Sequence, residues 1–505
     1  MKKVMIIIMS VIIMASALVI DSDVRAADDT IILRVCNWEE YIDEGGWADD
    51  EVIDLDSQDI FSKDGLIADF ENWFYDTYNR KVKVEYSTFG TNEELYSQLT
   101  LGDTYDLVCP SDYMIMKLMK EKKLEALSDD FFDDTNENNY YIKNVSPYIR
   151  DVFDENKIDD ESWTKYAAGY MWGITGMVYN PQYVTEEEAS TWSILTNEKF
   201  YRKVTVKDNV RDAYFPTVAI INADKLLDES FRASEDYQTQ LSTIMNDTDK
   251  ETIDKAEAIL KDIRNNVYSF ETDSGKSDMV TGKIIANLQW SGDGVYAIDQ
   301  AEEDGVYLNW AVPEECTNLW FDGWVMLKSG INGNADRKMA AQAFVNFLSR
   351  PDNAVRNMYY IGYTSVIAGG DDSVIYEYAN WNYGAEDDEE DVVEYPVGYF
   401  FSGDNEDENY IMEVPRDQLS RQLSAQYPSE EQIKRSAVMQ YFDAQANADI
   451  NQMWINIRCF NLSMISAEQW IITGIVIVVC AAVIVLFALR HKIFKKRIPN
   501  GYEKV

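Results

Sequence analysis

Histidine is nearly absent from this chain of 505 residues. The single one, His491, follows an apolar segment, 470–489, that is predicted to span a membrane, so it is separated from the bulk of the chain. General acid–base catalysis and Ser-His-Asp triads rely mostly on histidine, so this chemistry is not expected on the outer side of that membrane. A surface enzyme is therefore the least supported function class, and we expect that the protein is not an enzyme.

Basic residues are also scarce. Lysine and arginine number 45 against 89 aspartates and glutamates, which gives a formal net charge of −44. This balance argues against nucleic-acid binding, because phosphate contacts need basic side chains. The acidic excess permits a cationic partner without proving one, since acidic surfaces mostly serve solubility.

Cysteines are few and scattered. Cys480 lies within the apolar segment, and the other four, Cys36, Cys109, Cys316 and Cys459, do not have the spacing of metal ligands. A disulfide among these four stays an open possibility. Neither a metal nor a cofactor is expected.

Two ligand-binding loop motifs are missing as well. The segment "SGKS" (274–277) resembles the end of a phosphate loop, but Phe270 stands where that loop requires glycine. The acidic stretch 380–410 lacks the ligand spacing of an EF-hand, and it is interpreted as a solvated excursion rather than a calcium site. A second acidic stretch, 43–64, has no assigned role.

The first 26 residues have the layout of a secretory signal peptide. Two lysines precede a long apolar run, and small residues lead to a cleavage point at Ala26. An uncleaved N-terminal anchor is the alternative.

The segment 470–489 contains 20 residues without a charge, enough for a helix to cross a bilayer. The tail 490–505 begins with "RHKIFKKR", and basic residues beside a span stay on the cytoplasmic side. We therefore expect a single-pass membrane protein whose part 27–469 is extracellular or periplasmic.

The outer part is long enough for two or three domains, and its pattern is α/β. Strands are predicted at 31–38, 81–89 and 105–111, with helices at 65–79, 91–103 and 112–127. This βαβαβ series predicts a parallel sheet with right-handed crossovers. A second unit has strands at 203–206 and 284–290 and helices at 211–223, 249–266 and 291–304, and a long helix at 334–351 follows.

Local signals mark two helix starts in the first unit. Thr91 with Glu94 three residues later predicts a capping box, and the pair Ser111-Asp112 is expected to cap the start of the following helix.

The segment "TNLWFDGWVML" (317–327) has the pattern of a strand with aromatic and acidic side chains on one face. Because side chains alternate along a strand, Trp320, Asp322 and Trp324 share a face opposite Phe321. An edge strand with one isolated acid is the alternative interpretation.

Aromatic and acidic side chains also stand at the carboxyl ends of the other predicted strands, where open parallel sheets bind ligands. They are Trp38, Glu40 and Tyr41; Ser111 and Tyr113; Asp208 and Asp212; and Trp290.

This composition selects a class of ligand. Indole faces attract ammonium groups, by about 0.5–1 kcal/mol when exposed and about 2 kcal/mol or more when desolvated. Carboxylates hold charged ends through charge-assisted hydrogen bonds. A linear di- or polyamine fits this description, whereas a sugar would bring more amide and arginine donors and an anion would need basic groups or helix N-termini.

On these residues the sequence resembles the polyamine-binding (spermidine/putrescine) proteins of bacterial ABC transporters, a type II periplasmic-binding-protein family. The matching segments are "CNWEEYI" (36–42), "STFGTNEELYSQL" (87–99), "YDLVCPSDYMIMKLMKEKKLEAL" (105–127), "YMWGITGMVYN" (170–180), "KDNVRD" (207–212), "LQWSGDG" (288–294), "WFDGW" (320–324) and "FLSRPDNA…YIGYTSV" (347–366).

The resemblance implies an α/β fold of two lobes, each a mixed sheet flanked by helices, to which the C-terminal transmembrane helix is added here. The first lobe is expected over 27–165, completed by about 321–370. The second is expected over 166–320, completed by about 371–460.

The resemblance also implies a ligand site between the lobes. The residues carried over to it are Trp38, Glu40, Tyr41, Ser111, Tyr113, Asp208, Asp212, Trp290, Trp320, Asp322 and Tyr363. One acidic position of the family falls on Asn209 here, next to Asp208, and the lost carboxylate is expected to favour a different amine or to weaken binding. Trp324 is expected to be structural.

The function expected from the resemblance is capture of spermidine or putrescine outside the cytoplasm and delivery to an ABC transporter permease. Two alternatives keep the fold. One is binding of another small cation or amino compound, and the other is a surface receptor or adhesin without a transport partner.

Overall fold

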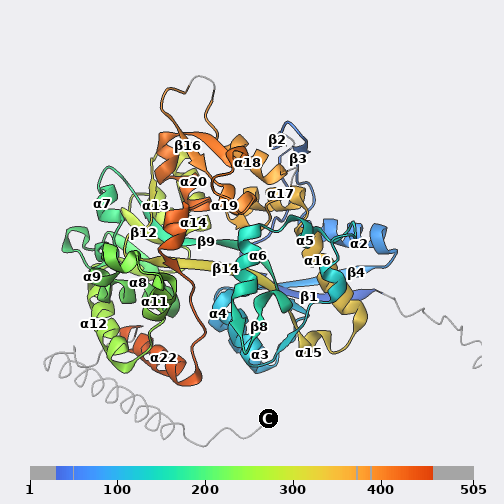
Figure 1. The fold of residues 1–505 in the computed structure, drawn as a ribbon, viewed down its shortest axis with the longest axis horizontal. Helices are drawn as coiled ribbons and strands as arrows, with labels where there is room; N and C mark the ends of the chain where they lie inside the picture. The colour runs from blue at the N-terminus through green and yellow to red at the C-terminus, as the bar shows by residue number, and fades with distance from the viewer. Residues whose placement is uncertain (1–29, 49, 371–372, 387–388, 459–505) are drawn as a thin grey trace, which may run out of the picture.

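The computed structural model describes residues 30–458, apart from 49, 371–372 and 387–388. It consists of two α/β lobes, with one further helical layer above the junction between them in Figure 1. The central strands of both lobes belong to one continuous sheet whose main path is β11-β10-β12-β9-β14-β5-β1-β4.

The first lobe is built on β1 (Ile31–Trp38), β4 (Val82–Phe89) and β5 (Leu107–Val108). Both neighbours of β1 run parallel to it, as the βαβαβ pattern predicted. Helices α2 (Leu66–Tyr78) and α3 (Asn92–Leu101) make the crossovers. Parallel pairing brings the carboxyl ends of β1 and β5 to the same edge of the sheet.

The second lobe repeats this arrangement with β10 (Val204–Lys207), β11 (Ser269–Glu271) and β12 (Ala286–Trp290), and β10 is parallel to both of the others. The helices that connect and flank these strands are α8 (Val210–Ile221), α12 (Lys250–Asn266), α13 (Gly275–Val280) and α14 (Ser291–Glu303).

Two long strands join the lobes: β9 (Ala167–Tyr179) and β14 (Thr317–Leu327). They pair antiparallel with each other, and every residue of both is buried. β9 continues to β12 on one side, and β14 continues to β5 on the other, so this pair forms the centre of the sheet (Figure 1). The lobe limits predicted from the sequence fall at these two strands and stay a proposal.

The remaining elements are shorter strands, of which β6, β13, β15 and β18 pair with β9 or β14 in the same sheet, and further helices. The helices are α4 (Asp112–Lys120), α5 (Tyr140–Asn144), α6 (Pro147–Glu155), α7 (Glu186–Ala189), α9 (Ala223–Leu226), α10 (Glu229–Arg232), α11 (Tyr237–Met245), α15 (Lys328–Ile331), α16 (Ala335–Leu348), α17 (Pro351–Ile361), α18 (Val374–Tyr383), α19 (Gly398–Phe401), α20 (Gln422–Gln426), α21 (Glu430–Lys434) and α22 (Ala444–Arg458). The short strands are β2 (Ile53–Asp54), β3 (Asp59–Ile60), β6 (Leu124–Glu125), β7 (Lys157–Ile158), β8 (Glu161–Ser162), β13 (Asn309–Ala311), β15 (Thr364–Ser365), β16 (Val392–Pro396), β17 (Ile411–Pro415) and β18 (Ser436–Ala437).

The two predicted helix caps have different outcomes. The Thr91 hydroxyl accepts a hydrogen bond from the Glu94 backbone N–H, but the Glu94 carboxylate accepts from Gly90 N–H, so the box is not closed on Thr91 itself. Ser111 occupies the N-cap position of α4, yet its side chain makes no capping bond. The prediction therefore fails for Ser111, whereas the Asp112 carboxylate accepts from the Tyr113 N–H in the first turn.

The interpretation of 380–410 as a solvated excursion needs correction. β16 and β17 form an antiparallel hairpin there, and the aromatic segment of α19 that follows β16 is buried. The Phe400 ring stacks on Trp172 of β9 at 5.4 Å between centroids. The acidic residues are therefore an exposed rim around a packed aromatic segment, whose burial outweighs the local charge.

The expected fold class included a transmembrane helix at 470–489, and this part is corrected. None of the helices in the described part of the chain is long and apolar enough to cross a bilayer. The segment 470–489, the tail 490–505 and the predicted signal peptide 1–26 lie outside the described residues. The fold of residues 30–458 is therefore that of the two lobes, without the expected membrane helix.

Three of the four cysteines considered for a disulfide, Cys36, Cys109 and Cys316, are buried as free thiols. Cys459 lies outside the described residues.

Candidate functional site

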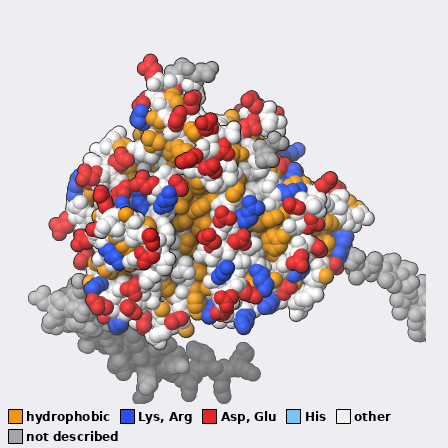
Figure 2. Space-filling view, in the orientation of Figure 1, with side chains coloured by type: hydrophobic (Ala, Val, Ile, Leu, Met, Phe, Trp, Pro, Cys, Tyr) orange, Lys and Arg blue, Asp and Glu red, His pale blue; other side chains and the backbone are white. Residues whose placement is uncertain are grey.

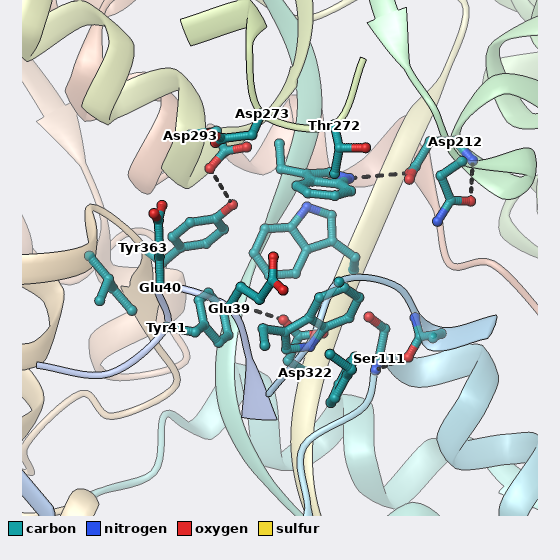
Figure 3. A pocket seen from close by; sticks show the side chains of 18 of the residues that line it. Glu39, Glu40, Tyr41, Ser111, Asp212, Thr272, Asp273, Asp293, Asp322 and Tyr363 are labelled. Atoms are coloured by element: carbon teal, nitrogen blue, oxygen red, sulfur yellow. Dashed lines mark hydrogen bonds between the residues drawn. The ribbon is translucent and has the colours of Figure 1, made fainter. Parts of the chain in front are cut away.

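A pocket of about 610 Å³ lies between the lobes, at the edge of the sheet where the parallel strands end. Trp38 enters it from the end of β1 and Trp290 from the end of β12, while Trp320 and Asp322 project from β14. Figure 3 shows ring side chains in the middle of the pocket, with Asp293 and Glu40 on one side of them and Asp212 on the other.

The structure brings ten of the eleven predicted site residues into this pocket. They are Trp38, Glu40, Tyr41, Ser111, Tyr113, Asp212, Trp290, Trp320, Asp322 and Tyr363. The eleventh, Asp208, is not among the lining residues, and its carboxylate forms an ion pair with Arg458 at 2.7 Å.

The pattern of the strand at 317–327 explains which of its residues reach the pocket. Trp320 and Asp322 do so, as alternation along the strand predicted. The register between β14 and β9 shifts between Asp322 and Gly323. Beyond this point Trp324 packs in the core against Tyr170, at 5.0 Å between ring centroids.

The aromatic side chains that line the pocket form two groups of rings in contact. Trp38 of the first lobe meets Trp290 of the second at 6.4 Å between centroids. Trp320 meets Tyr363 at 5.8 Å, and Tyr363 meets Tyr41 at 4.9 Å. Rings contributed by both lobes can thus enclose an alkyl chain and present their faces to a cation.

Asp322 is a buried carboxylate with an unused acceptor atom. The Tyr41 hydroxyl donates to Oδ2 at 2.8 Å, whereas Oδ1 has no hydrogen-bond partner among the described residues. Burial raises the pKa of Asp322 to about 6, and the Ser111 and Tyr41 side chains offset only part of this increase. A cation at this point would therefore meet a carboxylate that has neutral hydroxyl groups beside it and a free acceptor atom.

Asp212 has the same character on the other side of the rings. Trp290 Nε1 donates to Oδ1 at 3.2 Å. Burial raises the pKa of Asp212 to about 6 against the effects of this hydrogen bond and of Lys207. Asn209 caps α8 by accepting from the N–H groups of Arg211 and Asp212, so the residue that departs from the expected pattern holds the backbone of Asp212 in place.

A third buried carboxylate, Asp112, was not predicted as a site residue from the sequence. Its oxygens accept from the backbone N–H groups of Tyr113, at 2.6 Å, and Phe321, at 3.1 Å. Burial raises the pKa of Asp112 to about 8 despite these bonds, and the nearby Asp322 adds to the increase. Its predicted role was only to start a helix, and nothing in the local sequence distinguishes a buried acid from an exposed one.

The opposite side of the pocket holds acids that already have basic partners. Asp293 accepts from Lys207 Nζ at 2.8 Å and from the Tyr363 hydroxyl at 3.0 Å, and Lys276 Nζ lies 3.7 Å away. Burial alone would raise the pKa of Asp293, but the charges of Lys207 and Lys276 outweigh it and hold the pKa below its ordinary value. Asp293 and Lys276 were not predicted from the sequence either, because these pairs join distant segments.

The pocket as a whole is strongly acidic. Eight of its lining residues are acidic (Glu39, Glu40, Glu44, Asp112, Asp212, Asp273, Asp293 and Asp322) and two are basic (Arg211 and Lys276). Acidic side chains also spread over both lobes on the face that Figure 2 shows. Such a field raises the local concentration of cations and repels anions. Within the described residues, no three histidine, cysteine or acidic side chains are grouped so as to hold a metal ion.

Close packing against Gly292 holds the Tyr363 ring of the pocket in place. A Cβ at Gly292 would lie inside the contact distance of the Tyr363 ring. We expect Gly292→Ala to displace this ring, to break its bond to Asp293, and to lower the free energy of unfolding by about 1–3 kcal/mol in urea denaturation. The double variant Gly292→Ala/Tyr363→Leu should recover part of the loss. Equal losses in the single and double variants would show that the ring is not held by this contact.

Comparison with known proteins identifies relatives for most of the chain. The family described as "Bacterial extracellular solute-binding protein" matches residues 65–381. The spermidine/putrescine-binding periplasmic protein of Escherichia coli (strain K12) is 26% identical over 352 residues, which cover 69% of this chain and 81% of the relative. The putrescine-binding periplasmic protein PotF of the same organism is 25% identical over 283 residues, covering 54% and 67%.

Solved structures show the same fold. The spermidine/putrescine ABC transporter substrate-binding protein PotD from Streptococcus pneumoniae superposes with a TM-score of 0.53 at 21% identity, covering 85% of this chain and 98% of that one. The TpPotD lipoprotein of Treponema pallidum gives a TM-score of 0.54 at 16% identity, covering 85% and 99%. The two-lobed α/β architecture predicted from the sequence is thereby confirmed.

Proposed function

The chain belongs to the bacterial extracellular solute-binding protein family, and from this premise we propose that it captures a linear polyamine outside the cytoplasm and delivers it to an ABC transporter. The resemblance to polyamine-binding proteins that the sequence predicted is confirmed by the relatives. Those relatives bind spermidine and putrescine according to their names, and the same class of ligand fits the acidic, aromatic pocket between the lobes of this chain.

A single observation supports this function above the others: Asp212 and Asp322 are buried carboxylates that line one pocket with Trp38, Trp290 and Trp320 between the lobes. Burying a carboxylate without an ion-pair partner costs free energy, so an ammonium group that binds beside Asp212 and Asp322 would stabilise the pocket. The indole faces would cover the methylene groups that separate one amine from the next. The binding roles of all ten predicted residues in the pocket are part of this proposal.

Capture would occur by a hinge motion of the two lobes around the bound amine. Residues from both lobes line the pocket, with Trp38 and Tyr113 on one side and Trp290 and Asp212 on the other. Closure would bring these four side chains onto the ligand and remove it from water.

A second candidate is an amino compound with a carboxylate at its far end, and Lys276 is the observation that favours it. The Lys276 ammonium lines the pocket and could pair with such a carboxylate. However, its Nζ already lies 2.7 Å from Asp273, and a bound carboxylate would meet Asp293 and Glu40 as well. The charge around Lys276 therefore favours a fully cationic ligand.

Ligand binding should raise the melting temperature of the full chain. A ligand at a hundred times its Kd stabilises the folded state by about 2.7 kcal/mol, which corresponds to about 3 °C for a protein of this size. We expect putrescine and spermidine to produce this increase in differential scanning calorimetry, and glucose and aspartate to produce none. An increase with 4-aminobutanoate but with neither amine would contradict the proposal and support the second candidate.

A further inference from the structure

Lys276 introduces a cation of the protein itself into the acidic pocket. It is the second residue of α13, within the "SGKS" segment that lacks the glycine of a phosphate loop. Its Nζ lies 2.7 Å from Asp273 Oδ1, 3.7 Å from Asp293 Oδ1 and 3.8 Å from Glu40 Oε2. Only 16% of its side chain is exposed. Three carboxylates from three segments thus surround one ammonium group, as they would surround the amine of a ligand.

The backbone next to Lys276 is held in place by a hydrogen bond to the buried side chain of Glu271. Glu271, buried at the end of β11, accepts from the Gly275 N–H at 2.8 Å and from Asn287 Nδ2 at 3.1 Å. A Cβ at Gly275 would lie 2.5 Å from Glu271 Oε1, so this close approach requires glycine. The start of α13 is thereby fixed against the sheet, and the adjacent lysine points into the pocket from a rigid base.

Glu40 is the one residue of the first lobe among the three carboxylates around Lys276. Its backbone has a φ of 52°, a left-handed conformation that non-glycine residues rarely adopt, directly after β1. Its side chain is 82% exposed apart from the approach to Lys276. Lys276 is therefore the point at which a base of the second lobe meets an acid of the first.

The two sides of the pocket differ in how their charge is balanced. Asp293 is shared by Lys207 and Lys276, and Asp273 pairs with Lys276. Across the rings, Asp212 and Asp322 form no ion pair within 4.0 Å in the described part of the chain, and Figure 3 places Asp212 on the side opposite Asp293 and Glu40. Arg211 also lines the pocket beside Asp212, but its guanidinium lies over the Tyr113 and Phe442 rings and donates to the Gln440 carbonyl. A ligand amine is attracted to the side of Asp212 and Asp322. On the side of Asp273 and Asp293, the Lys276 ammonium already occupies the position that an amine would take.

We propose that the Lys276 ammonium permanently fills one amine position of the pocket, so that the protein selects a linear diamine over a longer triamine. This inference rests on the proposed function and adds its chain-length specificity. A diamine places its two charges near Asp212 and Asp322 and leaves Lys276 with its own partners. A triamine must bring its third charge toward Lys276, and two like charges at such distances repel each other strongly in a partly buried site.

Calorimetric titration of the full chain with putrescine and spermidine tests the proposal. We expect the unmodified protein to bind putrescine at least about tenfold more tightly than spermidine, a difference of about 1.4 kcal/mol. In Lys276→Met the carboxylates that Lys276 had paired with become available to the ligand. The ratio of putrescine affinity to spermidine affinity should therefore shift by about tenfold or more in favour of spermidine. Lys276→Arg keeps the charge and should keep the preference for putrescine.

Lys283→Met is the matched control, because Lys283 follows α13 and pairs with Asp278 outside the pocket. It should leave the ratio of the two affinities unchanged. An unmodified protein that prefers spermidine overturns the proposal even if Lys276→Met does not fold, and so does an unchanged ratio in a folded Lys276→Met. Absence of binding of either amine would instead overturn the proposed function.

Discussion

Replacing Asp322 with asparagine is expected to weaken amine binding by about a hundredfold, or about 2.7 kcal/mol. The change removes the one carboxylate on β14 that faces the pocket, whose Oδ1 is available to accept from an ammonium group. Without a ligand the effect should be small, because burial already disfavours the charged form of Asp322 and the amide oxygen can still accept from Tyr41. The ligand-free variant should therefore melt at or slightly above the temperature of the unmodified protein.

Titration calorimetry gives the change in Kd, and thermal unfolding reports whether the variant is folded. Asp208→Asn is the control, since Asp208 follows strand β10 of the second lobe, pairs with Arg458 and does not line the pocket. Its affinity should stay within about threefold of the unmodified value, as expected of a surface ion pair. If Asp322→Asn binds as tightly as the control, Asp322 is not a ligand contact.

Amine affinity is expected to fall steeply below pH 6. Asp212 and Asp322 each have a pKa of about 6 in the ligand-free pocket, raised by burial. At pH 5 about one in ten of each carboxyl group is ionised, so a ligand that needs both in the ionised form loses about tenfold in affinity for each. Above pH 7 the affinity should be nearly constant, and capture at pH 5–6 should release protons.

The ligand-free protein should show the opposite trend in stability. The pKa of an aspartate in the unfolded chain is about 3.9, below the folded values of Asp212 and Asp322. Between pH 4 and 6 the folded state therefore binds more protons than the unfolded state, and this contribution to stability is lost as the pH rises through about 6. Ligand should counteract the loss, so the increase in melting temperature caused by putrescine should be larger at pH 7.5 than at pH 5.

These pH effects can be traced to the pocket by the double variant Asp212→Asn/Asp322→Asn. It should flatten the dependence of the ligand-free protein's melting temperature between pH 4 and 6, since neither site then titrates. Other groups near these carboxyls, namely Lys207, Arg211, Glu93 and Asp112, remain in the variant and provide the background. Equal putrescine affinity at pH 5 and pH 7.5 in the unmodified protein would contradict the raised pKa values.

Much of the fold could be predicted because its first lobe follows local rules. Alternation along 31–38 and 81–89, with an amphipathic helix between them, predicts parallel neighbours, and the register of β1 with β4 confirms this. The aromatic segment 397–401 could not be predicted in the same way. It follows a highly acidic stretch, and only its contact with β9 explains why it is buried.

The pocket residues could be predicted where they lie at the carboxyl ends of strands or in segments that resemble the polyamine-binding proteins. Trp38, Trp290 and Trp320 come from such segments, and the structure places all three in one hollow. Asp293 and Lys276 differ because their significance lies in a pairing between α14 and α13. Sequence spacing carries no information on which lysine neutralises which acid, so the balance of charge across the pocket emerges only in three dimensions.

The position of Trp320 and Asp322 on the strand that crosses between the lobes has a mechanical consequence. β12 and β1, which carry Trp290 and Trp38, each lie two strands away from β14 in the sheet. Side chains near a pivot have short lever arms, whereas side chains farther out sweep through longer arcs. We therefore expect a ligand to contact Trp320 and Asp322 on the central strand first. The indoles of Trp38 and Trp290 would then close over it, so that binding and enclosure are separate kinetic steps.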